Sequence, residues 1–130
     1  MSDNEIDEIK ERIAAEARAL HPRLIGMSHT IHENPETLFQ EHKASALLTD
    51  ELEEHGFDVQ RGVAGLDTAF VATYGSGEPV IGILAEYDAL PKIGHACGHN
   101  LIGTWGVGAG IILRERVLPT RLQAIDPLLD

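Results

Sequence analysis

The sequence predicts an α/β domain in which helices pack on a mixed sheet. Apolar residues recur at three- and four-residue spacing through most of residues 5–55, which is the periodicity of amphipathic helices. Residues 80–84 form a near-continuous apolar run, typical of a strand buried on both faces of a sheet. A segment rich in small residues follows at 101–116, and its composition indicates a helix that lies close to that sheet.

The first half of the chain predicts mainly helices. Residues 5–20 are expected to form an amphipathic helix that Pro22 kinks or restarts, because proline lacks a backbone donor. A further helical piece is expected over 24–32. Another is expected over 37–55, with Gly56 as its C-terminal cap.

The second half predicts strands and one more helix. Short strands are expected at 58–61 and 69–74, before the buried strand at 80–84. The helix at 101–116 contains several glycines, each of which weakens a helix by about 1 kcal/mol. So many glycines indicate close backbone packing against the sheet.

The domain is expected to be incomplete. Residues 1–118 belong to it, whereas residues 119–130 form an atypical tail. Another buried strand should follow the last helix, but Pro119 and Pro127 interrupt the apolar residues there. We therefore expect the chain to be truncated.

Composition bounds the function. The chain has 130 residues, enough for one domain, and its formal charge of −11 argues against a nucleic-acid partner, which needs clustered Lys and Arg. No apolar run is long enough to cross a membrane. The acidic N-terminus lacks the pattern of a secretory signal, and the single Cys97 has no internal disulfide partner. The expected compartment is the cytoplasm.

The residues that carry chemistry follow the strand at 80–84. Glu86 and Asp88 are two residues apart, so both side chains point to one side if the strand continues through them. Cys97 and His99 are also two apart, and thiolate and imidazole suit Zn²⁺ or a similar metal ion. Considered alone, Cys97 could be a buried thiol without a chemical role, and His99 could be a hydrogen-bonded loop histidine. Together they favour an open, catalytic type of metal site.

Three neighbouring residues, Glu86, His95 and Asn100, have alternative or supporting roles. Glu86 is expected to be a metal ligand or to support one, with neither favoured. His95 is either a residue that supports a ligand or an ordinary loop histidine, and the second is favoured. Asn100 cannot act as a base, and its amide is expected to orient the loop.

The motifs resemble the M20 family of metallopeptidases, in its aminoacylase and amidohydrolase branch. The turn Asp88–Pro91 and the segment His95–Asn100 are similar to the first metal-binding segment of that branch. Residues 32–36 resemble its H-x-N-P-E element, and residues 62–70 its glycine-rich strand pair. The motif ends in Asn100 where other members have Asp, and this form most resembles the subgroup of p-aminobenzoyl-glutamate hydrolase and its dipeptidase-like relatives.

The resemblance implies metal-dependent hydrolysis of an amide bond in N-acyl amino acids or dipeptides. It implies a zinc-peptidase-like catalytic domain with one or two divalent ions, Zn²⁺ or Mn²⁺. It assigns Cys97 and His99 as metal ligands and Asp88 as the catalytic carboxylate that steers a ligand. The family's general-base Glu-Glu pair, its later ligands and its lid domain, which often makes dimers, have no counterpart in residues 100–130.

We therefore expect the N-terminal part of such an enzyme, inactive alone. An alternative is a non-catalytic metal-binding module that completes its site with a partner chain. A redox or nucleophilic role for Cys97 is the weaker third interpretation, because it needs a low thiol pKa and a positioned base, for which His99 is the one candidate nearby.

Overall fold

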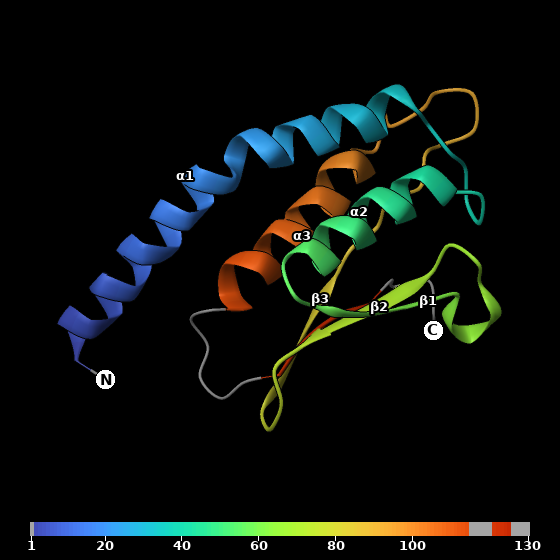
Figure 1. The fold of residues 1–130 in the computed structure, drawn as a ribbon. Helices are drawn as coiled ribbons and strands as arrows, with labels where there is room; N and C mark the ends of the chain where they lie inside the picture. Colours follow the sequence, from blue (N-terminus) through green and yellow to red (C-terminus); the bar gives the residue numbers. More distant parts are fainter. Residues whose placement is uncertain (1, 115–120, 126–130) are drawn as a thin grey trace.

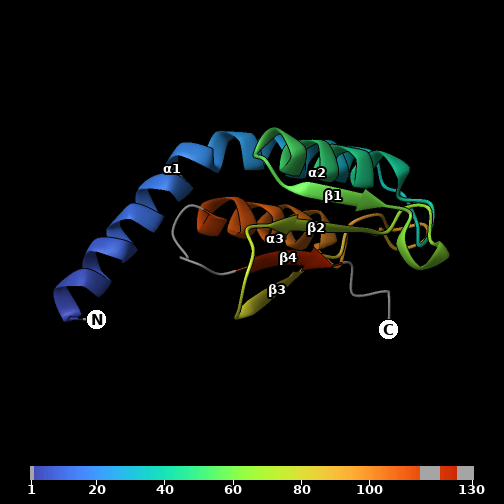
Figure 2. The ribbon, with the colours of Figure 1, turned by 60° about the horizontal axis from the view of Figure 1, so that its bottom comes forward.

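A four-stranded sheet carries helices on one side in the computed structural model, which describes residues 2–114 and the backbone of 121–125. The elements in chain order are α1 (Asp3–Glu33), α2 (His42–Glu54), β1 (Asp58–Arg61), a 3-10 turn (Val63–Gly65), β2 (Phe70–Tyr74), β3 (Val80–Leu84), α3 (His99–Arg114) and β4 (Arg121–Ile125). Helices α2 and α3 contact the strands, and α1 packs along α3 (Figures 1 and 2). The predicted α/β class is confirmed.

The sheet is mixed, as predicted. Its strand order is β1-β2-β4-β3, with antiparallel pairing of β1 to β2 and of β2 to β4. Strand β3 pairs with β4 in parallel, and α3 connects the two, as a parallel pair requires.

Strand β4 forms in the segment where an interruption was expected. It occupies residues 121–125, between Pro119 and Pro127 in the sequence, so neither proline removes a hydrogen bond from the ladder. The remainder of the expected tail, residues 119–120 and 126–130, lies outside the described residues. Truncation stays a prediction.

Helix α1 is continuous through Pro22. It changes direction about halfway along its length (Figure 1), so the expected kink is present but no restart occurs. Helix α2 begins at His42, later than predicted, because Thr37 pairs instead with Ala89 in an isolated bridge. Gly56 follows α2 with a φ of 83°, as expected of a C-terminal glycine cap.

The core lies between the helices and the sheet. Its fully buried side chains include Leu48 and Leu52 of α2, Phe70 of β2 and Val107 of α3. Among the residues that the structure describes, no helix combines the length and apolar character needed to span a membrane.

Strand β3 is more exposed than predicted. Val80 is 40% exposed, Ile81 39% and Leu84 61%, so the expectation of a strand buried on both faces is wrong. In the described part of the chain β3 lies at the edge of the sheet, and the helices cover only one face (Figure 2). Its apolar residues therefore have no layer over their outer side.

The glycines of α3 pack as the sequence predicts. A Cβ at Gly106 would lie 2.9 Å from the Ala85 Cβ and 3.2 Å from the Leu84 carbonyl oxygen. A Cβ at Gly103 would lie 3.0 Å from the Glu86 carbonyl oxygen. Hydrogen in place of a side chain lets α3 lie directly on the segment that carries the candidate site.

Candidate functional site

The loop of residues 85–98 leads from the carboxyl end of β3 to the first turn of α3. Burial alternates at its start: Ala85, Tyr87 and Ala89 are buried, whereas Glu86 and Asp88 are partly exposed. The two carboxylates are therefore on the side away from the core, as expected of an extended segment.

Tyr87 anchors this alternation. Its hydroxyl donates a hydrogen bond to the Thr68 carbonyl oxygen at 2.6 Å, and its ring stacks on Phe70 with 5.8 Å between the centroids. Tyr87 is not among the predicted site residues. An aromatic residue between two acidic ones in an extended run was the available signal, since its apolar body belongs in the core.

His99 lies between the two carboxylates. It is the first residue of α3, and its Nδ1 is 2.6 Å from Asp88 Oδ1. Its Nε2 is 3.3 Å from Glu86 Oε2. The side chains of His99 and Asp88 are 23% and 17% exposed, so the contact between them is largely shielded from water. The structure thus brings three of the predicted site residues together.

Asp88 fixes the tautomer of His99. A carboxylate only accepts hydrogen bonds, so the Nδ1 that faces Asp88 carries the proton. In the neutral imidazole, Nε2 then presents its lone pair. A carboxylate that orients a histidine in this way is a recurrent support for metal-ligating histidines.

Cys97 is an exposed, free cysteine in the same loop. Its thiol is open to solvent and to a ligand, not buried as the structural alternative requires. Within the described residues, no three His, Cys, Asp or Glu side chains are arranged to hold a metal ion. The chain therefore presents donors without a closed set of ligands.

His95 is buried, and neither of its ring nitrogens has a hydrogen bond of good geometry, although the Ile31 backbone lies close enough to act on the ring. Burial lowers the pKa of this imidazole, and the nearby His32 and His99 lower it further, against smaller opposing effects of Asp88 and the Ile31 backbone. Its ring centroid is 6.3 Å from that of His32 on α1. His95 is thus packed between the loop and α1, unlike an ordinary solvated loop histidine.

Asn100 is turned toward α1. Its Nδ2 donates to Ser28 Oγ at 2.9 Å, and the residue is buried. This amide group therefore joins the start of α3 to α1. The residue fixes where α3 begins, and with it the position of His99.

The H-x-N-P-E element supports the loop from the other side. The Glu36 carbonyl oxygen accepts a hydrogen bond from the Ala89 backbone N–H at 2.7 Å. The Glu36 carboxylate accepts hydrogen bonds from the backbone N–H groups of Lys43 at 2.9 Å and of Ala44 at 3.0 Å. Because Glu41 does not cap α2 with its own side chain, Glu36 satisfies free donors in the first turn.

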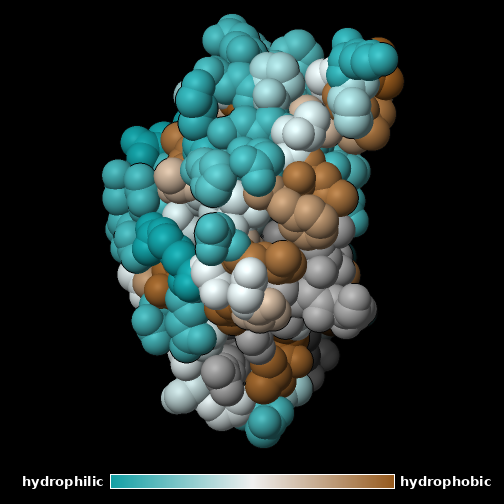
Figure 3. Space-filling model, turned by 90° about the vertical axis from the view of Figure 1, so that its right-hand side faces the viewer, coloured by the Kyte–Doolittle hydropathy of each residue, from teal (hydrophilic) through white to brown (hydrophobic). Residues whose placement is uncertain are grey.

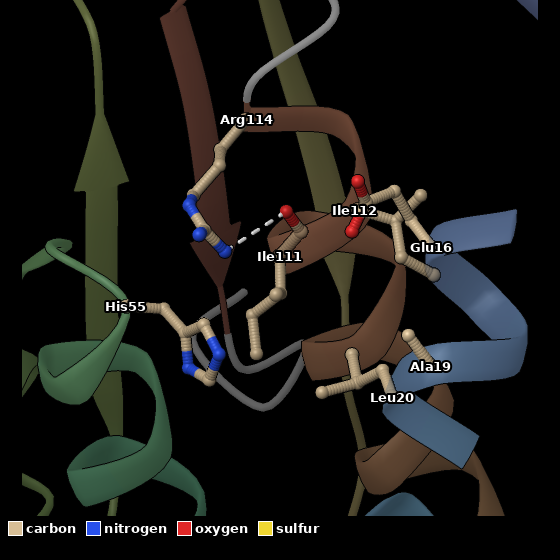
Figure 4. Close-up of a pocket in the computed structure, with 7 residues that line it drawn as sticks. All are labelled: Glu16, Ala19, Leu20, His55, Ile111, Ile112 and Arg114. Carbon is tan, nitrogen blue, oxygen red and sulfur yellow. Dashed lines mark hydrogen bonds between the residues drawn. The ribbon is translucent and has the colours of Figure 1, made fainter. Parts of the chain in front are cut away.

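A separate cavity of about 230 Å³ lies near the other end of α3 (Figure 4). Glu16, His55 and Arg114 supply its polar side chains, and Arg114 donates to the Ile111 carbonyl oxygen at 3.2 Å. His99 and Arg114 stand at opposite ends of α3, which at 1.5 Å per residue separates them by roughly 20 Å. The cavity is not part of the loop site.

The chain is similar in sequence to several characterised hydrolytic enzymes. The chain is 36% identical over 110 residues to one subunit of the p-aminobenzoyl-glutamate hydrolase of Escherichia coli, covering 72% of this chain and 23% of that protein. It is 38% identical over 120 residues to the Xaa-Arg dipeptidase of mouse, covering 85% of this chain and 28% of the relative. It is 34% identical over 115 residues to the N-acetylcysteine deacetylase of Bacillus subtilis, covering 76% and 30%. No protein-family model matches the chain.

Solved structures share the fold. A dinuclear metal-binding M20 peptidase from Bacillus subtilis superposes with a TM-score of 0.73 at 31% identity, over 84% of this chain and 35% of that one. The chain belongs to the M20 family. A protein assigned as an aminohydrolase from methicillin-resistant Staphylococcus aureus has the same fold, with a TM-score of 0.77 at 20% identity, over 89% and 34%. This M20 chain spans about a quarter to a third of the length of these relatives.

The donor set fits a divalent ion in chemistry, as a partial site. Ligands at about 2.1 Å from a tetrahedral ion are about 3.4 Å apart, and the His99 Nε2 and Glu86 Oε2 atoms are separated by 3.3 Å. Imidazole, carboxylate and thiol are all ligands for zinc-type ions. His99 is held in the tautomer that ligation requires, and Cys97 is exposed in the same loop.

Proposed function

We propose that this M20 chain supplies the first metal-binding part of a hydrolase that cleaves amide bonds in N-acyl amino acids or dipeptides. The observation that carries the proposal is the contact of His99 Nδ1 with Asp88 at 2.6 Å, which turns Nε2 toward Glu86 in a loop that also exposes Cys97. The names of the relatives, a hydrolase, a dipeptidase and a deacetylase, support this class of reaction.

Each residue has a separate role in this proposal. Cys97 and His99 hold a divalent ion, Zn²⁺ or Mn²⁺, and Asp88 keeps the proton on His99 Nδ1. Asn100 and Tyr87 fix the two ends of the segment that carries them. When bound, the ion supplies Lewis-acid chemistry, namely a lowered pKa for a water molecule and polarisation of the amide carbonyl.

The described residues do not complete this site. Among them, no three His, Cys, Asp or Glu side chains are arranged to hold a metal ion. We therefore infer that residues 1–130 alone do not turn over substrate. The cytoplasmic location, the small-molecule substrates and oligomerisation through a lid domain remain part of the proposal.

The test is to isolate the polypeptide that carries this sequence from its native cells, and to measure its intact mass and its hydrolytic activity. We expect release of free amino acid from N-acyl amino acids or dipeptides, lost on chelation and restored by Zn²⁺ or Mn²⁺. Hydrolysis that is unaffected by chelator would contradict metal dependence. No hydrolysis of any such substrate by a polypeptide much heavier than the 14.1 kDa of these 130 residues would contradict the reaction class.

A partner-dependent, non-catalytic module is the second candidate, and the exposed apolar surface favours it. The side of the molecule formed by the loops carries apolar patches between polar areas (Figure 3). Leu38 and Phe39 are exposed before α2, and Ile93 is 64% exposed in the site loop. A second polypeptide that co-purifies with the chain, with metal bound only in the complex, would support this candidate.

A further inference from the structure

We propose that a groove between α1 and α3 binds the N-terminal part of α1 from a second copy of this chain. The groove has a volume of about 520 Å³, and its walls are side chains of these two helices. None of the candidate metal donors lines it. The inference is therefore independent of the proposed function.

The exposed part of the groove is apolar. Trp105 is 61% exposed, Ile25 42% and Leu101 41%, so three large apolar side chains that line the groove are open to water. The buried Ser28 also lines it, and its Oγ already accepts a hydrogen bond from Asn100 Nδ2 at 2.9 Å. The groove therefore fits the apolar face of a helix, which can lay its side chains between two others.

The groove carries no negative charge, although the chain is acidic. His21 and His29 line it, and an adjoining hollow on α1 adds Arg18. No Asp or Glu of the described residues is among the lining side chains of either hollow. With a formal net charge of −11, two copies repel each other over most of their surface. An acidic segment meets the least repulsion at this groove.

The first part of α1 is such a segment. Residues 3–13, which we call the arm, carry Ile6, Ile9 and Ile13 at helical spacing. The charged residues of the arm are mostly acidic, with Asp3, Glu5, Asp7, Glu8 and Glu11 against Lys10 and Arg12. The arm projects from the rest of the described chain (Figures 1 and 2), and none of its isoleucines belongs to the described core.

A second copy supplies the arm with a suitable length and symmetry. At 1.5 Å per residue the arm is about 15 Å long, and the α1 side of the groove, from Ala17 to His29, is about 18 Å long. Because α1 is continuous from Asp3 to Glu33, the arm cannot fold back into the groove of its own chain. Two antiparallel α1 helices can instead place each arm in the groove of the other copy, about a two-fold axis.

The test uses the 130-residue chain, in which Trp105 is the single tryptophan, so its emission maximum reports whether the groove is covered. Ile9→Glu alters the arm, and Trp105→Ser alters the groove. The control Ile93→Ser removes an apolar side chain that is 64% exposed in the site loop. Ile9 and Trp105 both lie outside the described core, and far-UV circular dichroism checks that each variant is folded.

We expect the wild-type emission to move to shorter wavelength as the concentration is raised, while dimers appear in sedimentation velocity. Ile9→Glu should dimerise at least about tenfold more weakly, whereas Ile93→Ser should behave as the wild type does. Trp105→Ser has no tryptophan but an intact arm. Adding it to Ile9→Glu should restore the emission shift, because the mixed dimer regains one contact of arm with groove.

Three results would overturn the proposal. An emission maximum that stays constant while wild-type dimers form would show that the copies associate elsewhere, such as at the edge of β3. A shift that Ile9→Glu retains in full would show that another segment covers Trp105. A wild type that stays monomeric at all concentrations, with Trp105 open to water, would show that the groove binds no second copy.

Discussion

Glu36 illustrates how a single side chain can serve a motif without taking part in chemistry. Its carboxylate caps the first turn of α2, and its backbone carbonyl binds the site loop at Ala89. The H-x-N-P-E resemblance therefore has a structural basis in this chain. It joins the end of α1, the start of α2 and the candidate site.

Substitution of Glu36 should lower the stability of the fold. We expect Glu36→Ala to reduce the free energy of unfolding by about 1–2 kcal/mol, because the N–H groups of Lys43 and Ala44 lose their acceptor. Urea denaturation followed by circular dichroism measures the change. The control Glu33→Ala removes an exposed carboxylate at the end of α1 and should have little effect; equal losses in both variants would contradict the capping role.

Part of the candidate site could be predicted from residue spacing and motif resemblance. The placement of Glu86 and Asp88 on one side follows from their two-residue spacing, and the support of a ligand by Asp88 is what the family resemblance implies. The burial of His95 and the contact of Asn100 with Ser28 could not be predicted, because both depend on where α1 lies. Sequence spacing says nothing of a helix so far away along the chain.

At the scale of elements, two glycines allow α3 to lie close to the segment that follows β3. Gly103 and Gly106 face the segment that carries Ala85 and Glu86, and Gly110 faces looser surroundings. Substitutions at these positions can therefore distinguish a glycine that close packing requires from one that only lowers the helix propensity of α3.

Gly106→Ala and Gly110→Ala should therefore change stability in opposite directions. The new methyl group at 106 would meet Ala85 Cβ at 2.9 Å, and we expect a loss of about 1–3 kcal/mol. At 110 the nearest atom is Phe57 Cζ at 3.6 Å, an ordinary contact, so the better helix propensity of alanine should stabilise by up to about 1 kcal/mol. Chemical denaturation of both variants measures this, and a stabilising Gly106→Ala would contradict the close packing.

The contact between α2 and β1 is electrostatic at its exposed edge. Arg61 of β1 donates to Glu53 Oε1 at 2.6 Å and to Asp50 Oδ1 at 3.0 Å, both on α2. The hydrogen bond from the Arg61 side chain is the main cause that lowers the pKa of Glu53 below its usual value of 4.5.

This lowered pKa predicts a pH dependence. The ionised Glu53 stabilises the fold above the unfolded-state pKa, and the contribution is lost as pH falls through the lower folded-state pKa. Glu53→Gln should therefore lower the melting temperature slightly at neutral pH, and the difference from the wild type should shrink on acidification below pH 4.5. Thermal melts at a series of pH values measure it; a difference that grows at low pH would have the wrong sign.

The sequence was sufficient for the elements whose determinants are local. Strand β1, the cap at Gly56 and the glycine-rich α3 follow from periodicity and turn residues. Strand β3 was assigned correctly but its burial was not, because an apolar composition does not reveal whether a second layer covers the sheet. Strand β4 was not predicted as a regular strand, because Pro119 and Pro127 flank its five residues and proline is disfavoured within a sheet.

At the scale of the whole molecule, apolar surface remains uncovered in the described part. Leu84 and Trp105 are each 61% exposed, the first on the edge strand and the second on α3. The chain spans about a quarter to a third of the length of the relatives it matches.

We therefore expect the isolated 130-residue chain to self-associate. Exposed apolar patches promote association, and an unpaired edge strand offers a ladder to a second chain. Sedimentation velocity over a range of concentrations should show growing oligomers, reduced by Trp105→Ser. A monomer with a sharp, reversible thermal transition at all concentrations would contradict this expectation.

Equilibrium Zn²⁺ binding to the 130-residue chain shows whether Cys97 and His99 bind a divalent ion. Comparison with Cys97→Ser and His99→Gln isolates the two donors. We predict that the wild type binds one ion per chain and that each variant binds at least about tenfold more weakly, because each loses one ligand. Zinc binding of equal strength in all three proteins, or none in the wild type, would contradict the account.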